Sequence, residues 1–174
     1  MVKGRTRGYH RAAVDAFLAG ARESFERDDD AVTSAHIREA SFPLGRNGYE
    51  IEAVDRALGR LEDAFAGRER DRAIAARGRE EWVTEARGLA QEVLDHLARP
   101  RKHRFARTGL LTFGYRVAEV DHVADLITRY LRDGEPLTPE QVRSAAFRMQ
   151  RRGYREEQVD ALLDATVEVI LAVR

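Results

Sequence analysis

The sequence contains one pattern four times: a glycine and a tyrosine, then four variable residues, then a valine and an aspartate. The copies are Gly8-Tyr9/Val14-Asp15, Gly48-Tyr49/Val54-Asp55, Gly114-Tyr115/Val120-Asp121 and Gly153-Tyr154/Val159-Asp160. At average residue usage, four fixed positions match by chance at roughly 10⁻⁵ per starting point. The chain is therefore built from repeats, and the repeat constrains its fold more than any single residue does.

A second pattern precedes the second and fourth copies. It reads Thr33-x3-Ile37-x3-Ser41-Phe42 before the second copy and Thr138-x3-Val142-x3-Ala146-Phe147 before the fourth, without a gap between them. The simplest account is a two-motif unit that has itself been duplicated. We therefore predict a first unit at 1–66, a helical connector ending in a basic linker at 67–104, and a second unit at 105–174.

Apolar residues follow each motif at helical spacing, which predicts an amphipathic helix after each copy. After the fourth copy, for example, they are Val159, Leu162, Leu163, Val167 and Ile170. Thr33 and Thr138 have the character of helix N-caps, and Thr138-x-x-Gln141 matches a capping box, so each begins a short helix that should end near Phe42 or Phe147. Strand signals are nearly absent. The predicted fold is all-α, with repeated short helix–loop–long helix units packed as a helical bundle or a coiled-coil assembly.

Architecture alone accounts for the four motif residues. We expect the glycine to hold a positive φ where the loop turns into the helix. The tyrosine ring should close the base of the helix while its hydroxyl finds a partner. The valine belongs to the apolar stripe, and the aspartate complements the positive end of the helix dipole, an effect of about 0.3–1 kcal/mol.

The connector also has helical periodicity, through Trp82, Ala86, Leu89, Val93 and Leu97. It either continues the helix that begins near Tyr49 or breaks from it near Gly67 or Gly78, because glycine weakens a helix interior. Pro100 ends the helix in both cases.

Composition excludes several functions. Lys plus Arg and Asp plus Glu are both 30, so no net field attracts nucleic acid or an acidic membrane, and we expect nucleic acid not to be the partner. There is no cysteine, and the five histidines lack the spacing of metal ligands. Asp28-Asp29-Asp30 lacks the pattern of a calcium loop and is interpreted as a charged linker. We expect no cofactor and no enzymatic activity.

No apolar run of about 20 residues and no signal peptide is present, which favours a cytoplasmic protein.

One dense basic cluster lies after the connector: Arg99, Arg101, Lys102, Arg104 and Arg107. It is either a solvated linker or a patch that attracts phosphates at a membrane surface or in nucleic acid. Leu110, Leu111 and Phe113 follow it directly. Together the cluster and these apolar residues are the candidate membrane or phosphate contact of the chain.

The two patterns together resemble the N-terminal domain of DivIVA, the coiled-coil scaffold of cell poles and division sites in Gram-positive bacteria. The resemblance is carried by Leu137-Thr138-Pro139-Glu140-Gln141-Val142, Ala146-Phe147, Arg152-Gly153-Tyr154 and Val159-Asp160-Ala161-Leu162-Leu163, and by residues 31–65. The first and third copies keep only the Gly-Tyr-x4-Val-Asp helix.

The resemblance implies a non-enzymatic cytoplasmic domain that acts at a division site or cell pole. It also implies dimerisation through the helices, and membrane contact through the loop before Gly-Tyr, where membrane-binding relatives carry an apolar residue and an arginine. The matching pairs here are Thr6-Arg7, Arg46-Asn47, Thr112-Phe113 and Arg151-Arg152, so the third loop is the candidate for insertion. The expected partner is another protein or a second copy of the chain, with weak peripheral membrane contact. Four motifs in one chain also suggest that the motifs pair internally, as a one-chain version of the family dimer.

Overall fold

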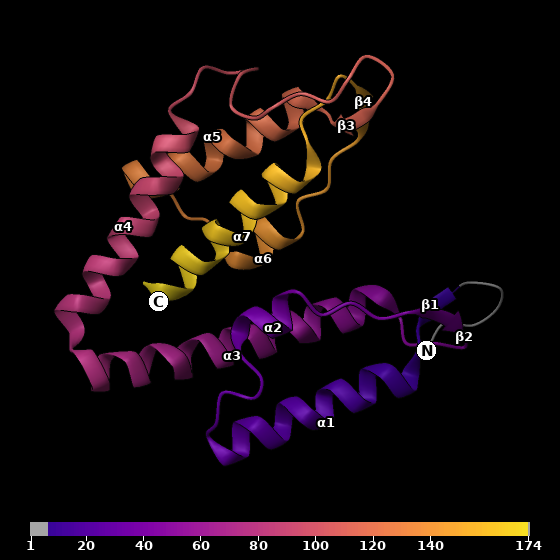
Figure 1. The fold of residues 1–174 in the computed structure, drawn as a ribbon, viewed down its shortest axis with the longest axis vertical. Coiled ribbons are helices and arrows are strands. Elements are labelled where there is room, and N and C mark those ends of the chain that lie inside the picture. Colours follow the sequence, from indigo (N-terminus) through magenta and orange to yellow (C-terminus); the bar gives the residue numbers. More distant parts are fainter. Residues whose placement is uncertain (1–6, 174) are drawn as a thin grey trace. The chain divides into compact units, whose positions relative to one another are not determined.

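The computed structural model of the chain describes residues 7–173, so Thr6 and the rest of the expected start of the first unit lie outside the described residues. The chain divides into two compact units, one up to Ala76 and one from Arg77 onward (Figure 1). This division differs from the predicted ranges 1–66, 67–104 and 105–174. The connector is not a separate element, because its first residues extend the last helix of unit 1 and the rest belong to unit 2.

Unit 1 has one core, built from three helices. Its elements are β1 (Arg7–Tyr9), α1 (Arg11–Arg27), α2 (Ser34–Arg38), β2 (Leu44–Arg46) and α3 (Ile51–Arg77). Val14 and Ala21 of α1, Ile37 of α2, and Leu58 and Phe65 of α3 are buried together. Both long helices begin beside the β1–β2 pair (Figure 1). The apolar stripes that follow the first two motifs, on α1 and α3, are therefore buried in one common core.

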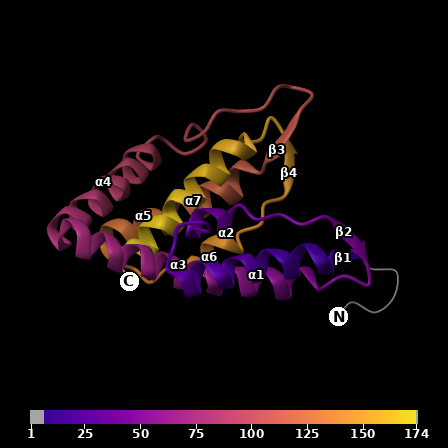
Figure 2. The same ribbon diagram turned by 60° about the horizontal axis from the view of Figure 1, so that its bottom comes forward.

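Unit 2 repeats this arrangement and adds one helix. Its elements are α4 (Arg79–Leu97), β3 (Phe113–Tyr115), α5 (Val117–Asp133), α6 (Pro139–Arg143), β4 (Met149–Arg151) and α7 (Glu156–Ala172). The core joins Val93 of α4, Ile127 of α5, Val159 of α7 and Phe105 of the segment between α4 and β3. Figure 2 shows α5 and α7 of this unit from a second direction.

The predicted caps of the short helices are confirmed. The side-chain oxygen of Thr138 accepts from the backbone N–H of Gln141, and the Gln141 side chain accepts from the N–H of Thr138. Thr33 and His36 form the same reciprocal pair at α2, which the sequence did not suggest because histidine is not the usual partner. Both helices end at an arginine, Arg38 and Arg143, and not near Phe42 and Phe147 as predicted. The phenylalanines lie in the irregular segments that lead into β2 and β4.

The long helical stretch breaks at Gly78, between α3 and α4. Gly78 has φ 95° and ψ 156°, a backbone conformation that residues with a Cβ rarely adopt. Gly67 lies inside α3, where the helix continues through it. Of the two break points weighed from sequence, the structure therefore selects Gly78.

The mainly helical character predicted from the sequence is confirmed, with one addition. Four strands of three residues occur in residues 7–173, and they pair as β1–β2 and β3–β4, both antiparallel. Three residues are too few for an alternating pattern to appear in the sequence, so these strands were not predicted. β1 and β3 contain Tyr9 and Tyr115, and each of these tyrosines forms an isolated bridge with the other motif tyrosine of its unit, Tyr49 or Tyr154.

Candidate functional site

In each unit the two motif copies cross and bond to each other. In unit 1 the backbone N–H of Tyr9 donates to the carbonyl of Tyr49 at 3.0 Å, and the N–H of Tyr49 donates back at 2.9 Å. In unit 2 Tyr115 and Tyr154 exchange the same two bonds, both at 2.9 Å. We call each of these pairs of motifs a crossing. Each motif copy is thus paired with another copy in the same chain: copy 1 with copy 2, and copy 3 with copy 4.

The motif glycines are required by this close approach. A Cβ on Gly8 would lie 2.1 Å from the carbonyl oxygen of Tyr49, and one on Gly114 would lie 2.2 Å from that of Tyr154. Gly48 and Gly153 are equally crowded, at 2.4 and 2.3 Å from backbone oxygens of the partner motif.

The positive φ expected at these four glycines is wrong. The left-handed backbone in the second and fourth copies occurs one residue earlier, at Asn47 (φ 56°) and Arg152 (φ 55°). The glycines are needed because a Cβ would collide with the other motif, and a single copy of the pattern does not reveal that neighbour.

Each motif tyrosine bonds the aspartate of the partner motif. The hydroxyl of Tyr49 donates to Oδ1 of Asp15 at 3.0 Å, and that of Tyr154 donates to Oδ1 of Asp121 at 3.1 Å. The reciprocal pairs are Tyr115 with Asp160, at 3.5 Å, and Tyr9 with Asp55. The predicted hydroxyl partner therefore exists, and it explains why tyrosine and aspartate recur together.

Burial and the neighbouring carboxylate both oppose ionisation of these tyrosines. In Tyr115 and Tyr154, desolvation is the larger cause and the negative charge of Asp160 or Asp121 the next, and together they raise the pKa to about 12. The pKa of Tyr49 is also raised, chiefly by its hydrogen bond to Asp15. The hydroxyls therefore remain protonated donors at neutral pH.

The motif valines are all core residues, as their stripe position predicts. Val14, Val54, Val120 and Val159 are buried. The motif tyrosines differ in burial: Tyr154 is fully buried, whereas Tyr9, Tyr49 and Tyr115 are half-buried. The crossing of unit 2 is thus covered on one side, and the covering segment is the basic cluster.

Arg104, at the centre of the basic cluster, is a buried structural residue. Only 7% of it is exposed. Its guanidinium donates to the carbonyls of Leu97 and Asp121 and to Oδ1 of Asp125, at 3.2, 3.0 and 2.8 Å. Its backbone N–H donates to the hydroxyl of Tyr154 at 3.3 Å. This corrects the prediction for Arg104, since a guanidinium held inside the unit does not contact a membrane or phosphate.

The other cations of the cluster remain at the surface, along a segment that is fixed to the unit. The backbone N–H of Lys102 donates to Oδ2 of Asp121 at 2.8 Å. Arg107 donates to the carbonyls of Arg152 and Lys102 at 3.0 and 3.1 Å, and its guanidinium stacks on the ring of Tyr154. Arg99 donates to the carbonyl of Arg104, and Arg101 pairs with Asp125. The segment is therefore an ordered cover and not a freely solvated linker.

The candidate insertion loop exposes its apolar residues. Leu110, Leu111 and Phe113 are 70%, 86% and 52% exposed, which is unusual for side chains of this size in one short loop. The guanidinium of Arg151 lies over the ring of Phe113, its cross-strand partner. The loop thus combines apolar side chains with a nearby cation.

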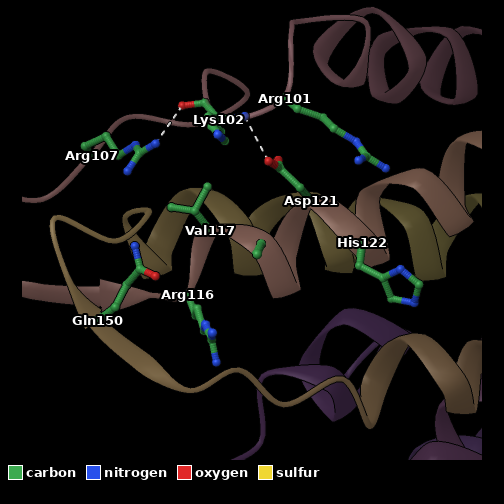
Figure 3. Close-up of a pocket in the computed structure, with 9 residues that line it drawn as sticks. Arg101, Lys102, Arg107, Arg116, Val117, Asp121, His122 and Gln150 are labelled. Atoms are coloured by element: carbon green, nitrogen blue, oxygen red, sulfur yellow. Dashed lines mark hydrogen bonds between the residues drawn. The ribbon is translucent and has the colours of Figure 1, made fainter.

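Two adjoining hollows lie beside the crossing of unit 2, and we call them together the basic groove. The first, of about 560 Å³, is lined by Arg101, Lys102, Arg107, Arg116, Val117, Ala118, Asp121, His122 and Gln150. The second, of about 620 Å³, is lined by Lys102, His103, Phe105, Arg107, Arg151 and Arg152. Figure 3 shows the cationic segment passing over α5, with Lys102 above Asp121.

Sequence reasoning found Arg101, Lys102 and Arg107 of this groove and missed Arg116, His122 and Gln150. Arg116 is the residue before α5, and Gln150 lies in β4. Neither belongs to a charged run, so no local signal identified them; only the crossing brings their segments together.

The acidic run Asp28-Asp29-Asp30 binds arginines of α3. Arg72 pairs with Asp28 and Asp30, and Arg68 donates to the carbonyl of Asp29 at 3.0 Å. In residues 7–173, no group of three or more histidine, aspartate and glutamate side chains is arranged to hold a metal ion. Within the same described stretch, no helix has the length and apolar character needed to cross a membrane.

Comparison with known proteins gives no match to a family model, to a curated protein or to a solved structure.

Proposed function

We propose that the chain is a non-enzymatic, DivIVA-like adaptor of bacterial cell division or polar growth, which acts through protein–protein contacts. The observation that carries the proposal is the pair of crossings. Each uses all four kinds of motif residue, and these are the residues on which the resemblance to DivIVA rests. Each unit would then be one pairing module of the repeat.

The crossings also suggest how such an adaptor is built. A family dimer needs two chains to bring two motifs together, whereas here copies 1 and 2, and copies 3 and 4, lie in one chain and exchange backbone bonds. The motifs therefore pair without a second copy of the chain. Their outer faces and loops are what the adaptor would offer to other proteins at a division site or cell pole.

The test is the position of the protein in its own dividing cells. A fluorescent fusion to the full chain should gather at the septum or a pole, and depletion should alter cell length or shape. The fluorescent protein alone is the control. A fusion that stays evenly distributed through the cell cycle, together with normal cell shape on depletion, would contradict the proposal.

A second candidate function, contact with a membrane surface, is favoured by the loop of Leu110, Leu111 and Phe113. These side chains are exposed although burying each would be worth about 1.5–3 kcal/mol. Flotation with anionic vesicles tests it. Changing both leucines to serine should abolish binding, whereas equal flotation of this variant and the original chain would exclude insertion by the loop.

A further inference from the structure

We propose that the basic groove binds an acidic segment of a partner protein, in which carboxylate or phosphate groups follow one another along an extended chain. This inference rests on the adaptor function proposed above and names the kind of partner that one face of the adaptor takes.

The charge of the groove favours an anionic ligand. The chain as a whole carries equal numbers of cations and anions, yet six cations line the groove: Arg101, Lys102, Arg107, Arg116, Arg151 and Arg152. Asp121 is the single carboxylate among the described lining residues. Its oxygens already accept from Tyr154 and from the backbone of Lys102. The groove is therefore a local concentration of positive charge in a neutral molecule, which attracts anions selectively.

Four of these six charges are not compensated by a carboxylate. Arg101 is paired with Asp125, and Arg116 lies 3.4 Å from Glu119. The remaining four, Lys102, Arg107, Arg151 and Arg152, form no ion pair with any carboxylate in residues 7–173. Arg107 is held in place by the two carbonyls to which it donates, so its charge is positioned before any ligand arrives. An incoming anion would thus meet four cations without a competing carboxylate, and one of them, Arg107, is already held in position.

The shape of the groove favours a peptide over larger anions. The two hollows share Lys102 and Arg107 and so adjoin, which gives a path of successive cations between Arg116 and Arg152. A path of this kind suits a narrow chain with successive anionic groups. A nucleic-acid duplex or a bilayer presents a broad convex or flat surface, which meets protruding side chains more readily than side chains lining a hollow.

The two crossings supply matched substitutions that remove charge without disturbing the backbone. Arg152 corresponds to Asn47 of the second copy, and the two have φ of 55° and 56°. Arg152→Asn therefore places at this position a residue that the chain already uses in the same conformation. Lys102 also has a positive φ, of 68°, and asparagine tolerates that region well, so Lys102→Asn is the companion change. Arg46→Gln removes a charge from β2 of unit 1, at the counterpart of Arg151, and is the control.

The experiment measures binding of short labelled peptides to the full chain by fluorescence anisotropy, at low and at physiological ionic strength. The probes are oligoglutamate, a peptide of the same length with two phosphoserines, and oligoglutamine. We expect the two anionic peptides to bind and oligoglutamine not to bind. Binding should weaken as salt rises. Lys102→Asn and Arg152→Asn should each weaken it by about tenfold, the size of one charge-assisted hydrogen bond, while Arg46→Gln leaves it unchanged.

The inference is overturned if the anionic peptides bind no better than oligoglutamine, or if the groove variants bind as tightly as the control. It is also overturned if duplex DNA or anionic vesicles bind through the same two residues more tightly than either peptide does. The relative affinity of oligoglutamate and the phosphopeptide tells whether carboxylates or phosphates are preferred. Absence of peptide binding with a fusion that still gathers at the septum would sink this inference alone; a diffuse fusion with intact peptide binding would instead sink the division role.

Discussion

The hydroxyl of Tyr154 donates a hydrogen bond to Oδ1 of Asp121, 3.1 Å away, and so joins the fourth motif to the third. The same hydroxyl accepts from the backbone of Arg104, and the second oxygen of Asp121 holds the backbone of Lys102. One tyrosine and one aspartate thus connect the crossing of unit 2 with the segment that covers it. In unit 1, the corresponding hydroxyl of Tyr49 lies at an exposed contact with Asp15.

Removing this hydroxyl should reveal the difference between the two crossings. Tyr154→Phe removes the hydrogen bond to Oδ1 of Asp121 and the acceptor of the buried N–H of Arg104, so we expect a loss of about 1–3 kcal/mol in the free energy of unfolding. Tyr49→Phe removes a hydrogen bond that water replaces, and should cost less than about 1 kcal/mol. Urea unfolding followed by circular dichroism measures both. Equal losses would mean that burial of the hydroxyl does not determine how much its hydrogen bond contributes to the free energy of unfolding.

The glycine requirement can be tested in the same way. Gly114→Ala puts a Cβ 2.2 Å from a carbonyl oxygen and 2.8 Å from a methyl carbon of Thr108, and the paired backbones have to separate to accept it. We expect a loss above about 3 kcal/mol, at the severe end for a single substitution, because backbone pairing itself is disturbed.

Gly67→Ala is the matched control for this substitution. Nothing lies within 4 Å of a Cβ at Gly67, which is inside α3, so alanine should stabilise the helix by about 0.5–1 kcal/mol. Thermal unfolding of the two variants should shift in opposite directions. If Gly114→Ala unfolds at the same temperature as the original chain, the two backbones of the crossing are less tightly paired than their hydrogen bonds indicate.

The contrast between local and distant contacts explains which features the sequence could predict. The cap that the Thr138 side chain forms on the N–H of Gln141 spans three residues, and the stripe that buries Val159 spans a few turns of one helix, so both were evident from spacing. The role of Gly8 depends on Tyr49, in another copy of the motif. The burial of Arg104 depends on Asp125, 21 positions later. Such contacts exist only once the motifs cross, and a pattern along the chain does not encode which copies meet.

Alkaline titration gives a further test of the tyrosine–aspartate pairs. In the folded protein the pKa of Tyr154 is raised to about 12 from its ordinary value of 10.0. The unfolded state therefore loses the proton first as pH rises. The stability contributed by this group is complete below pH 10 and is lost as pH rises toward 12.

Tyrosinate absorbance should accordingly show a late fraction of tyrosines in the folded chain, and Tyr154→Phe should reduce that fraction. Asp121→Asn removes the neighbouring negative charge, so the pKa of Tyr154 should fall toward its ordinary value where the fold persists. A titration in which all tyrosines ionise together near 10 would show that the hydroxyls are not held by the aspartates.

The crossings also predict the state of association. Since each motif finds its partner within its own unit, pairing of the motifs supplies no contact for a second chain. We expect light scattering to give the mass of one chain across a wide concentration range. A mass that rises to that of two chains, and falls again on Gly114→Ala, would mean that motifs exchange between molecules. A rise that the glycine substitution leaves unchanged would place the contact elsewhere, on an outer face of the helices, and would make self-association part of how the adaptor works.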